Sequence, residues 1–189
     1  MRPSIEFQVQ WRPYRLDPTI PREGVDRRAY LRAKFGDGPQ TQSMGDAIRS
    51  EGQREGIAFA FEKIAISPNT LNSHRLVRWA SGSGRQDAMV ERLFQAYFIE
   101  GRDVGNRNVL VEAAAEIGLD AGLVGRLLDD DEADTDLIER EDALAHEMGI
   151  TGVPTFIFDN RYMLSGAREA ELLVRVIDKA NERPAEARV

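Results

Sequence analysis

The 189-residue chain contains no cysteine, and this absence excludes several kinds of site. Without cysteine the chain can form neither a disulfide framework nor a cysteine-based zinc site. It also offers no thiolate, the form of cysteine that acts as a nucleophile. The two histidines, His74 and His146, lie far apart in the sequence and lack the spacing of metal ligands. We therefore expect no metal and no cofactor.

An excess of basic residues and a long apolar run are lacking as well. The net charge of −7 argues against nonspecific nucleic-acid binding, which needs Lys and Arg gathered on one face. No apolar run approaches the ~20 residues of a membrane span, and residues 1–7 contain no apolar signal-peptide segment. We expect a protein that binds neither nucleic acid nor membrane and resides in the cytoplasm.

Enough apolar residues are present to build a folded core. The chain is 42% hydrophobic and 30% charged, which is not the composition of a disordered protein. Its length suits one domain, or one domain that carries a large insertion.

The two ends of the sequence predict strands. Residues 5–11 read Ile-Glu-Phe-Gln-Val-Gln-Trp, and this alternation predicts a strand with one buried face. Residues 155–158 and 162–165 flank Asp159-Asn160 and predict a hairpin. An amphipathic helix over 168–180 follows. These elements have to pack together to bury their apolar faces.

The residues between these ends predict mostly helices, because apolar positions recur at helical spacing between capping residues and glycines. Their apolar stripes indicate a helical part with a core of its own. Residues 57–66 stay ambiguous between a short extended piece and an irregular segment. The expected helices cover about 26–36, 40–55, 71–80, 86–99, 108–117, 121–128 and 133–148.

Residues 149–158, Gly-Ile-Thr-Gly-Val-Pro-Thr-Phe-Ile-Phe, are the most informative stretch. A Val-Pro step stands directly before a strand, and an X-Pro bond favours trans by only ~0.5–1 kcal/mol. A trans bond that merely ends the preceding helix is the plain alternative. We predict that Val153–Pro154 is cis and exposes the backbone of Val153 to an extended substrate.

Four segments resemble, in one consistent order, blocks of the FrnE-like members of the DsbA family. They are 11–21 (Trp-Arg-Pro-Tyr-Arg-Leu-Asp-Pro-Thr-Ile-Pro), 68–80 (Pro-Asn-Thr-Leu-Asn-Ser-His-Arg-Leu-Val-Arg-Trp-Ala), 94–104 and 149–158. The resemblance runs from about residue 6 to residue 180. The family consists of thioredoxin-fold thiol–disulfide oxidoreductases. Its relatives include 2-hydroxychromene-2-carboxylate isomerase and the kappa-class glutathione transferases.

The resemblance implies an α/β, thioredoxin-like fold with a large all-α insertion. Residues 1–24 and 149–181 would form the thioredoxin-like half, 25–148 the helical insertion and 182–189 a flexible tail. The likeness starts at the family's second strand. The first strand and the following helix, which carry a Cys-x-x-Cys or a serine in the family, are therefore expected to be missing. A misplaced start or a truncation explains this better than an inactive paralogue.

The resemblance also implies substrate contacts, although no catalytic residue. Asn69 and His74 belong to a helix that lies over the active-site cleft in relatives. From the residues alone, Asn69 is a turn residue and His74 an ordinary histidine of an amphipathic helix. The expected contacts are Gly152, Val153, Pro154, Thr155, Asn69, His74 and Gly166.

Gly166 is the expected contact for an anion. In kappa-class relatives this corner holds the γ-glutamyl carboxylate of glutathione, and the free N–H groups of a helix start suit that role. The sequence Gly166-Ala167-Arg168-Glu169 lacks the Asp-Arg order typical of those relatives, and an ordinary helix start is the alternative. The acidic run 129–132 is interpreted as a solvated turn.

Three functions stay open. The chain resembles a FrnE-like thiol–disulfide oxidoreductase that is inactive as written because its nucleophilic cysteines are absent. The alternatives are a glutathione-dependent isomerase or transferase and a noncatalytic thioredoxin-fold binding module. The expected partner is a disulfide- or thiol-containing peptide or a small thiol such as glutathione. Formation of a homodimer is left open.

Overall fold

The structure, a computed structural model, describes residues 5–36 and 38–182. The chain divides into two compact units, one reaching to Glu139 and the other starting at Arg140. The expected tail 182–189 lies, apart from Glu182, outside the described residues.

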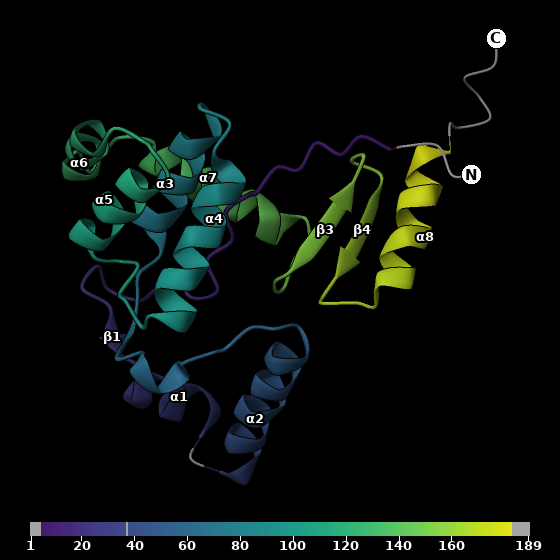
Figure 1. The fold of residues 1–189 in the computed structure, drawn as a ribbon, viewed down its shortest axis with the longest axis horizontal. Coiled ribbons are helices and arrows are strands. Elements are labelled where there is room, and N and C mark those ends of the chain that lie inside the picture. Colours follow the sequence, from purple (N-terminus) through teal and green to yellow (C-terminus); the bar gives the residue numbers. More distant parts are fainter. Residues whose placement is uncertain (1–4, 37, 183–189) are drawn as a thin grey trace. The chain divides into compact units, whose positions relative to one another are not determined.

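Four helices of the first unit pack around one hydrophobic core (Figure 1). Leu76, Met89 and Leu110 come from three of these helices and are fully buried. Complete burial of such a side chain stabilises the fold by about 1.5–3 kcal/mol relative to exposure. The helices are α3 (Leu71–Ser81), α4 (Gln86–Phe94), α5 (Arg107–Glu116) and α6 (Ala121–Asp129).

Local signals set the ends of most helices, as the sequence predicts. Asn106 and Asp120 accept hydrogen bonds from backbone N–H groups in the first turns of α5 and α6, which is the role of an N-cap. Gly101 follows the helical stretch with a φ of 73°, and an added Cβ would lie 2.6 Å from the Lys63 carbonyl oxygen. Both conditions require glycine there.

The remaining helices of the first unit also fall near their expected ranges. They are α1 (Arg27–Phe35) and α2 (Pro39–Arg54), and α7 (Thr135–Glu147) runs from this unit into the second. The ambiguous segment contains the short 3-10 helix η1 (Phe61–Lys63) and the strand β2 (Ile66–Ser67). The latter pairs antiparallel with β1 (Val25–Asp26), a two-residue strand that the sequence pattern does not indicate.

The helix expected over 86–99 changes type before it ends. After α4, residues Gln95–Ile99 form the π-helix η2. Its aromatic side chains join a cluster in which the rings of Tyr97 and Phe98 lie 5.0 Å apart and those of Phe59 and Phe98 lie 5.9 Å apart. A π-turn re-aims side chains relative to an α-helix, and apolar spacing alone does not distinguish the two.

Residues 5–11 form no strand, so this part of the sequence-based prediction is wrong. Phe7, Val9 and Trp11 are 61%, 64% and 42% exposed instead of forming a buried face. The physical reason is that a strand needs a neighbour to pair with. Among the residues that the structure describes, the two sheets are the pairs β1–β2 and β3–β4, and neither includes this segment.

Trp11 nevertheless holds the C-terminal end of this segment in place. Its backbone N–H donates to Gln86 Oε1 at 3.0 Å, and its indole N–H donates to Asp87 Oδ1 at 2.5 Å. The Gln86 side-chain amide donates back to the Trp11 carbonyl oxygen at 3.2 Å. The first turn of α4 therefore anchors the chain at residue 11.

The second unit consists of the end of α7, a hairpin and a closing helix (Figure 1). The hairpin is β3 (Thr155–Phe158) and β4 (Tyr162–Ser165), with the bounds that the sequence predicts. Asp159 and Asn160 between them both have a φ of 51°, the left-handed geometry of tight hairpin turns. Helix α8 (Ala170–Asn181) then contacts β3.

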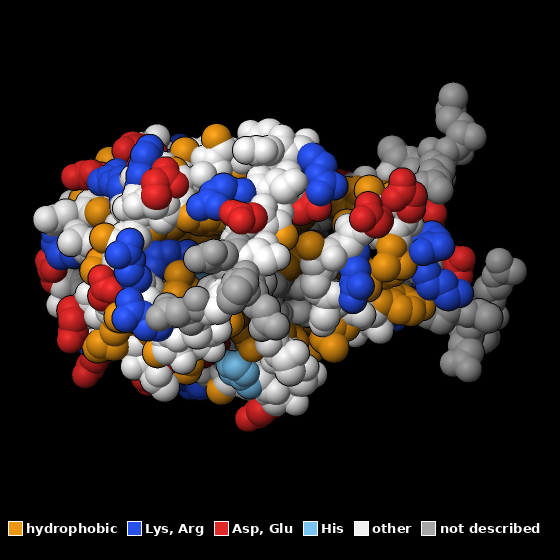
Figure 2. All heavy atoms as spheres, turned by 90° about the horizontal axis from the view of Figure 1, so that it is seen from below, with side chains coloured by type: hydrophobic (Ala, Val, Ile, Leu, Met, Phe, Trp, Pro, Cys, Tyr) orange, Lys and Arg blue, Asp and Glu red, His pale blue; other side chains and the backbone are white. Residues whose placement is uncertain are grey.

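The surface shows no accumulation of one charge on the face drawn in Figure 2, where acidic and basic side chains are interspersed. Within residues 5–36 and 38–182, no helix has both the length and the apolar character needed to cross a membrane.

Candidate functional site

The turn before β3 and the first residue of that strand include four of the predicted contact residues. The Val153–Pro154 peptide bond is cis, the geometry expected from the sequence. The Thr155 hydroxyl donates to the Gly152 carbonyl oxygen at 2.8 Å and closes the turn from within. Val153 is 53% exposed and Pro154 is exposed as well. The turn thus presents an apolar surface held by its own hydrogen bond.

Gly166 lies against this turn but does not open the last helix. Its backbone N–H donates to the Pro154 carbonyl oxygen at 2.7 Å, and α8 begins only at Ala170 with Glu169 as its N-cap. The expectation of a free N–H at a helix start is therefore wrong at Gly166. Its φ of 82° requires glycine, because a left-handed backbone is costly for residues with a Cβ.

The bond between Gly166 and Pro154 also determines which backbone groups of β3 face outward. In an antiparallel pair, hydrogen-bonded and non-hydrogen-bonded positions alternate along each strand. Pro154 bonds toward β4, so Thr155 and Ile157 direct their N–H and C=O groups to the opposite edge. No third strand covers that edge among the described residues. Edges of this kind are the ones to which extended chains add as strands in other proteins.

Asn69 has the structural role of a turn residue. Its side-chain N–H donates to the Ile20 carbonyl oxygen at 2.7 Å, and its Oδ1 accepts from the Leu71 N–H at 3.0 Å. The latter bond takes the place of a cap from Thr70, the residue directly before α3, whose side chain makes no capping bond. His74 is half-buried in α3. Asn69 and His74 belong to the first unit and the other predicted contacts to the second.

Asn69 borders a small pocket at the N-terminal end of α3. The volume of about 20 Å³ has room for roughly one water molecule. It is too small for a peptide or for glutathione. The residues that line it are Arg22, Asn69, Leu71, Asn72, Arg75, Gly105, Asp131 and Thr135.

Arg75 binds the backbone of the turn between α6 and α7. The sequence pattern does not indicate this contact. The side chain is 1% exposed, and its Nε donates to the Ala133 carbonyl oxygen at 2.6 Å. Its Nη2 donates to the carbonyl oxygens of Leu127, at 2.7 Å, and Asp130. Burial lowers the pKa of this guanidinium, which stays charged in proteins. The acidic run 129–132 is solvent-exposed, as expected.

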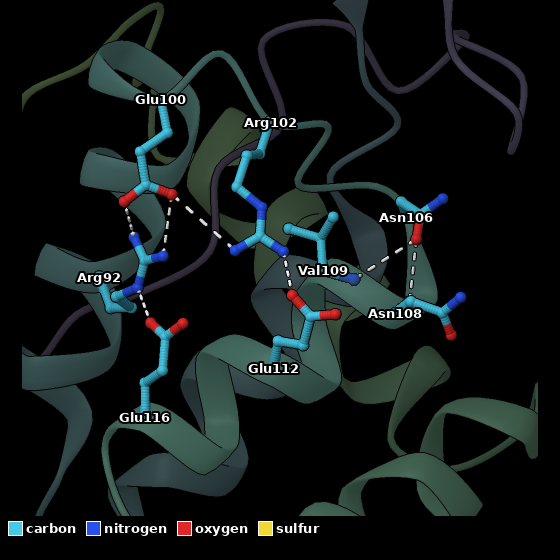
Figure 3. Close-up of polar contacts among 8 residues, drawn as sticks. All are labelled: Arg92, Glu100, Arg102, Asn106, Asn108, Val109, Glu112 and Glu116. Carbon is cyan, nitrogen blue, oxygen red and sulfur yellow. Dashed lines mark hydrogen bonds and ion pairs between the residues drawn. The ribbon is translucent and has the colours of Figure 1, made fainter.

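A second ionic cluster joins α4, η2 and α5 (Figure 3). Arg92 Nη2 donates to Glu100 Oε2 at 2.9 Å, and Arg92 Nε donates to Glu116. Arg92 Nη1 lies 2.9 Å from Glu100 Oε1, an ion-pair contact without hydrogen-bond geometry. The hydrogen bond from Arg92 lowers the pKa of Glu116, and the two carboxylates raise the pKa of Arg92.

Arg102 extends this cluster by pairing with Glu112 on α5 and lying 3.8 Å from Glu100. Each arginine contacts two carboxylates of this cluster, so the cluster links α4 and α5 to each other and to the residues that follow η2. Across residues 5–36 and 38–182, no group of three or more acidic or histidine side chains is placed to hold a metal ion.

The family described as DSBA-like thioredoxin domain matches residues 2–178. The protein YwbO of Bacillus subtilis is 25% identical over 175 residues, which cover 91% of this chain and 82% of that protein.

Two solved structures resemble the fold. The crystal structure of the probable DsbA oxidoreductase SCO1869 from Streptomyces coelicolor matches with a TM-score of 0.83 and 30% identity, covering 92% of this chain and 76% of that chain. The structure of 2-hydroxychromene-2-carboxylate isomerase matches with a TM-score of 0.63 and 19% identity, over 83% of this chain and 78% of the isomerase. The second likeness concerns the fold alone.

Proposed function

The chain belongs to the DSBA-like thioredoxin domain family, and from this we propose that it is a FrnE-like member that binds a thiol- or disulfide-containing peptide. The proposed binding site is the turn at Gly152, Val153, Pro154 and Thr155. The observation that carries the proposal is the exposure of Val153 and Pro154 next to the unpaired edge of β3. We place this activity in the cytoplasm.

The geometry suits recognition of an extended main chain. A peptide that lies along the edge exchanges backbone hydrogen bonds with it, and neighbouring side chains add specificity. The apolar surface of Val153 and Pro154 would contact a side chain of the peptide. Strand addition depends on the backbone of the ligand, so we expect a broad choice of peptide sequence. His74 is kept as a further proposed contact, from the family resemblance.

These 189 residues cannot carry out thiol–disulfide exchange by themselves. Exchange proceeds by attack of a thiolate on a disulfide sulfur, and the sequence contains no cysteine. The role we propose for this chain is therefore binding of the sulfur-containing partner without covalent chemistry.

The related isomerase and transferase functions have less support in the geometry. The N–H of Gly166, proposed to hold the carboxylate of glutathione, already donates to Pro154. The pocket at Asn69 holds about one water molecule. A small thiol such as glutathione stays a second candidate ligand of the turn, to be tested beside the peptide.

Calorimetric titration tests the proposal with two probes, a linear peptide whose single cysteine is held in a mixed disulfide and oxidised glutathione. Val153→Arg is expected to weaken peptide binding by about tenfold or more, equivalent to 1.4 kcal/mol. Met163→Arg is the matched control, because Met163 is 51% exposed but lies on β4. Equal losses in both variants, or no binding by the unsubstituted chain, would contradict the proposal.

A further inference from the structure

The peptide group between Gly152 and Val153 has two polar atoms with different surroundings. The Gly152 carbonyl oxygen accepts a hydrogen bond from the Thr155 hydroxyl at 2.8 Å. The Val153 N–H has no acceptor among residues 5–36 and 38–182. Within the turn that we propose to bind a peptide, this N–H is therefore a donor that a ligand can satisfy.

The two atoms are coupled because the peptide bond that joins them is planar. This bond is trans, since the cis bond among the described residues is the next one, Val153–Pro154. In a planar trans peptide unit the C=O and the N–H point in opposite directions. The Gly152 oxygen points toward Thr155, so the Val153 N–H points away from it. Whatever holds the carbonyl oxygen in place also sets the direction of the N–H.

Gly152 offers little resistance to rotation of this peptide plane. Glycine has no Cβ and adopts a wide range of φ and ψ. An added Cβ at Gly152 would meet no atom within 4 Å, so the space around the residue does not select one conformation either. The hydrogen bond from Thr155 is therefore the contact that fixes the orientation of the plane.

The hairpin holds the side chain of Thr155 in place. Thr155 is the first residue of β3 and lies opposite Ser165 of β4 in the register. Its branched side chain has few χ1 rotamers, and its Oγ1 lies 3.5 Å from Ser165 Oγ. The single hydroxyl hydrogen of Thr155 is donated to Gly152, so Ser165 is the donor in this long contact. The strand register thus determines where the Thr155 hydroxyl stands.

We infer that Thr155 is a positioning residue of the proposed peptide site: its hydroxyl holds the Gly152 carbonyl and thereby directs the Val153 N–H to the ligand. The inference rests on the proposed function. It gives Thr155 a role different from the direct substrate contact that the family resemblance implies. The group that such a backbone donor selects is a carbonyl oxygen of an extended peptide main chain.

Two substitutions of Thr155 separate its hydroxyl from the shape of its side chain. Thr155→Val keeps the branched shape, which suits a strand, and removes the donor. Calorimetric titration with the mixed-disulfide peptide should show binding weaker by about five- to tenfold, as expected for the loss of one hydrogen bond. Thr155→Ser should bind within about twofold of the parent chain, because serine supplies the same donor. Chemical denaturation confirms that each variant is folded during the titration.

Thr135→Val is the matched control. The Thr135 hydroxyl donates to the Asp131 carbonyl oxygen at 2.7 Å at the start of α7. This variant therefore also loses a hydroxyl–carbonyl bond, but outside the turn, and its affinity for the peptide should equal that of the parent chain. Equal weakening by Thr135→Val and Thr155→Val would overturn the inference, because it would assign the effect to a general loss of stability.

The direction of the N–H can also be followed without a ligand. In nuclear magnetic resonance spectra of the isotopically labelled free protein, the amide signal of Val153 should move in Thr155→Val and stay near its parent position in Thr155→Ser. An unmoved Val153 signal in Thr155→Val, or unchanged affinity of that variant for the peptide, would overturn the inference. If the parent chain binds no peptide, the proposed function is wrong, and the Val153 signal still decides whether Thr155 orients the turn.

Discussion

The backbone N–H of Gly166 donates to the carbonyl oxygen of Pro154 across 2.7 Å. Proline has no N–H, so this pair of residues can form one backbone hydrogen bond instead of two. The bond ties the end of β4 to the turn before β3, and it takes up an N–H that a helix start would have left free. It therefore couples the conformation at Gly166 to the shape of the proposed peptide site.

Gly166→Ala is expected to destabilise the fold by about 1–2 kcal/mol, because a φ of 82° is unfavourable for alanine. Steric crowding is not the cause, since an added Cβ would meet nothing nearer than Arg168 Nε at 3.9 Å. Chemical denaturation measures the change. Gly152→Ala is the control, because Gly152 also has open space around it but no positive φ. Equal effects of both substitutions would contradict the backbone argument.

Arg92→Met should lower the free energy of unfolding by about 1–3 kcal/mol, because it removes the cation shared by Glu100 and Glu116. The side chain of Arg92 is only 12% exposed, so water replaces little of the lost interaction. Arg54→Met removes the surface pair with Glu51, whose side chains are 67% and 64% exposed, and should cost well below about 1 kcal/mol. Urea titration measures the free energy of unfolding of both variants. Similar decreases would show that the cluster in Figure 3 stabilises the fold no more than an exposed ion pair does.

Glu116 should contribute to the acid sensitivity of the fold. Arg92 lowers the pKa of this carboxyl group below its ordinary value of 4.5. A carboxylate with a lowered folded-state pKa stabilises above its unfolded pKa, and that stability is lost as pH falls through the folded pKa. Glu116→Gln should therefore be less stable than the parent at neutral pH, with the difference shrinking below pH about 4.5. Urea midpoints across this pH range measure it, and a constant difference would contradict the assignment.

Arg75→Lys should destabilise the first unit strongly although it keeps the charge. A lysine cannot reproduce the planar fork that reaches the carbonyl oxygens of Leu127 and Ala133, and buried acceptors left unpaired cost about 1–3 kcal/mol each. Arg22→Lys is the control, since Arg22 contacts the same turn through Asp131 while 68% exposed. Thermal unfolding of both variants is the measurement. A small effect at Arg75 would show that the turn does not need this clamp.

Local chemistry made most of the fold predictable. The side chains of Asn106 and Asp120 cap the helices that begin after them, and the turn at Asp159-Asn160 joins strands with the expected bounds. These features depend on neighbours in the sequence, so the pattern contains them. The α/β, thioredoxin-like fold class follows from the family resemblance and agrees with the family match.

Features that depend on distant partners were not predictable in the same way. The alternation of residues 5–11 records a preference for strand, but pairing needs a second strand that local sequence does not specify. Arg75 sits in an amphipathic helix, and nothing near it in the sequence indicates that it binds carbonyl oxygens more than 50 residues away. The engagement of the Gly166 N–H likewise depends on Pro154, across the whole hairpin.

The second unit contains little buried apolar surface, so we expect it to be locally less stable than the helical core of the first unit. Of the buried apolar residues, Ile150, which is 9% exposed, is the one from the described part of this unit. A segment with so little buried apolar surface opens by local fluctuation at a lower free energy than the helical core does. Any molecule that binds only the folded hairpin raises the free energy of its local opening by mass action. Amide protons of the hairpin would then report occupancy, exchanging more slowly when a peptide is bound.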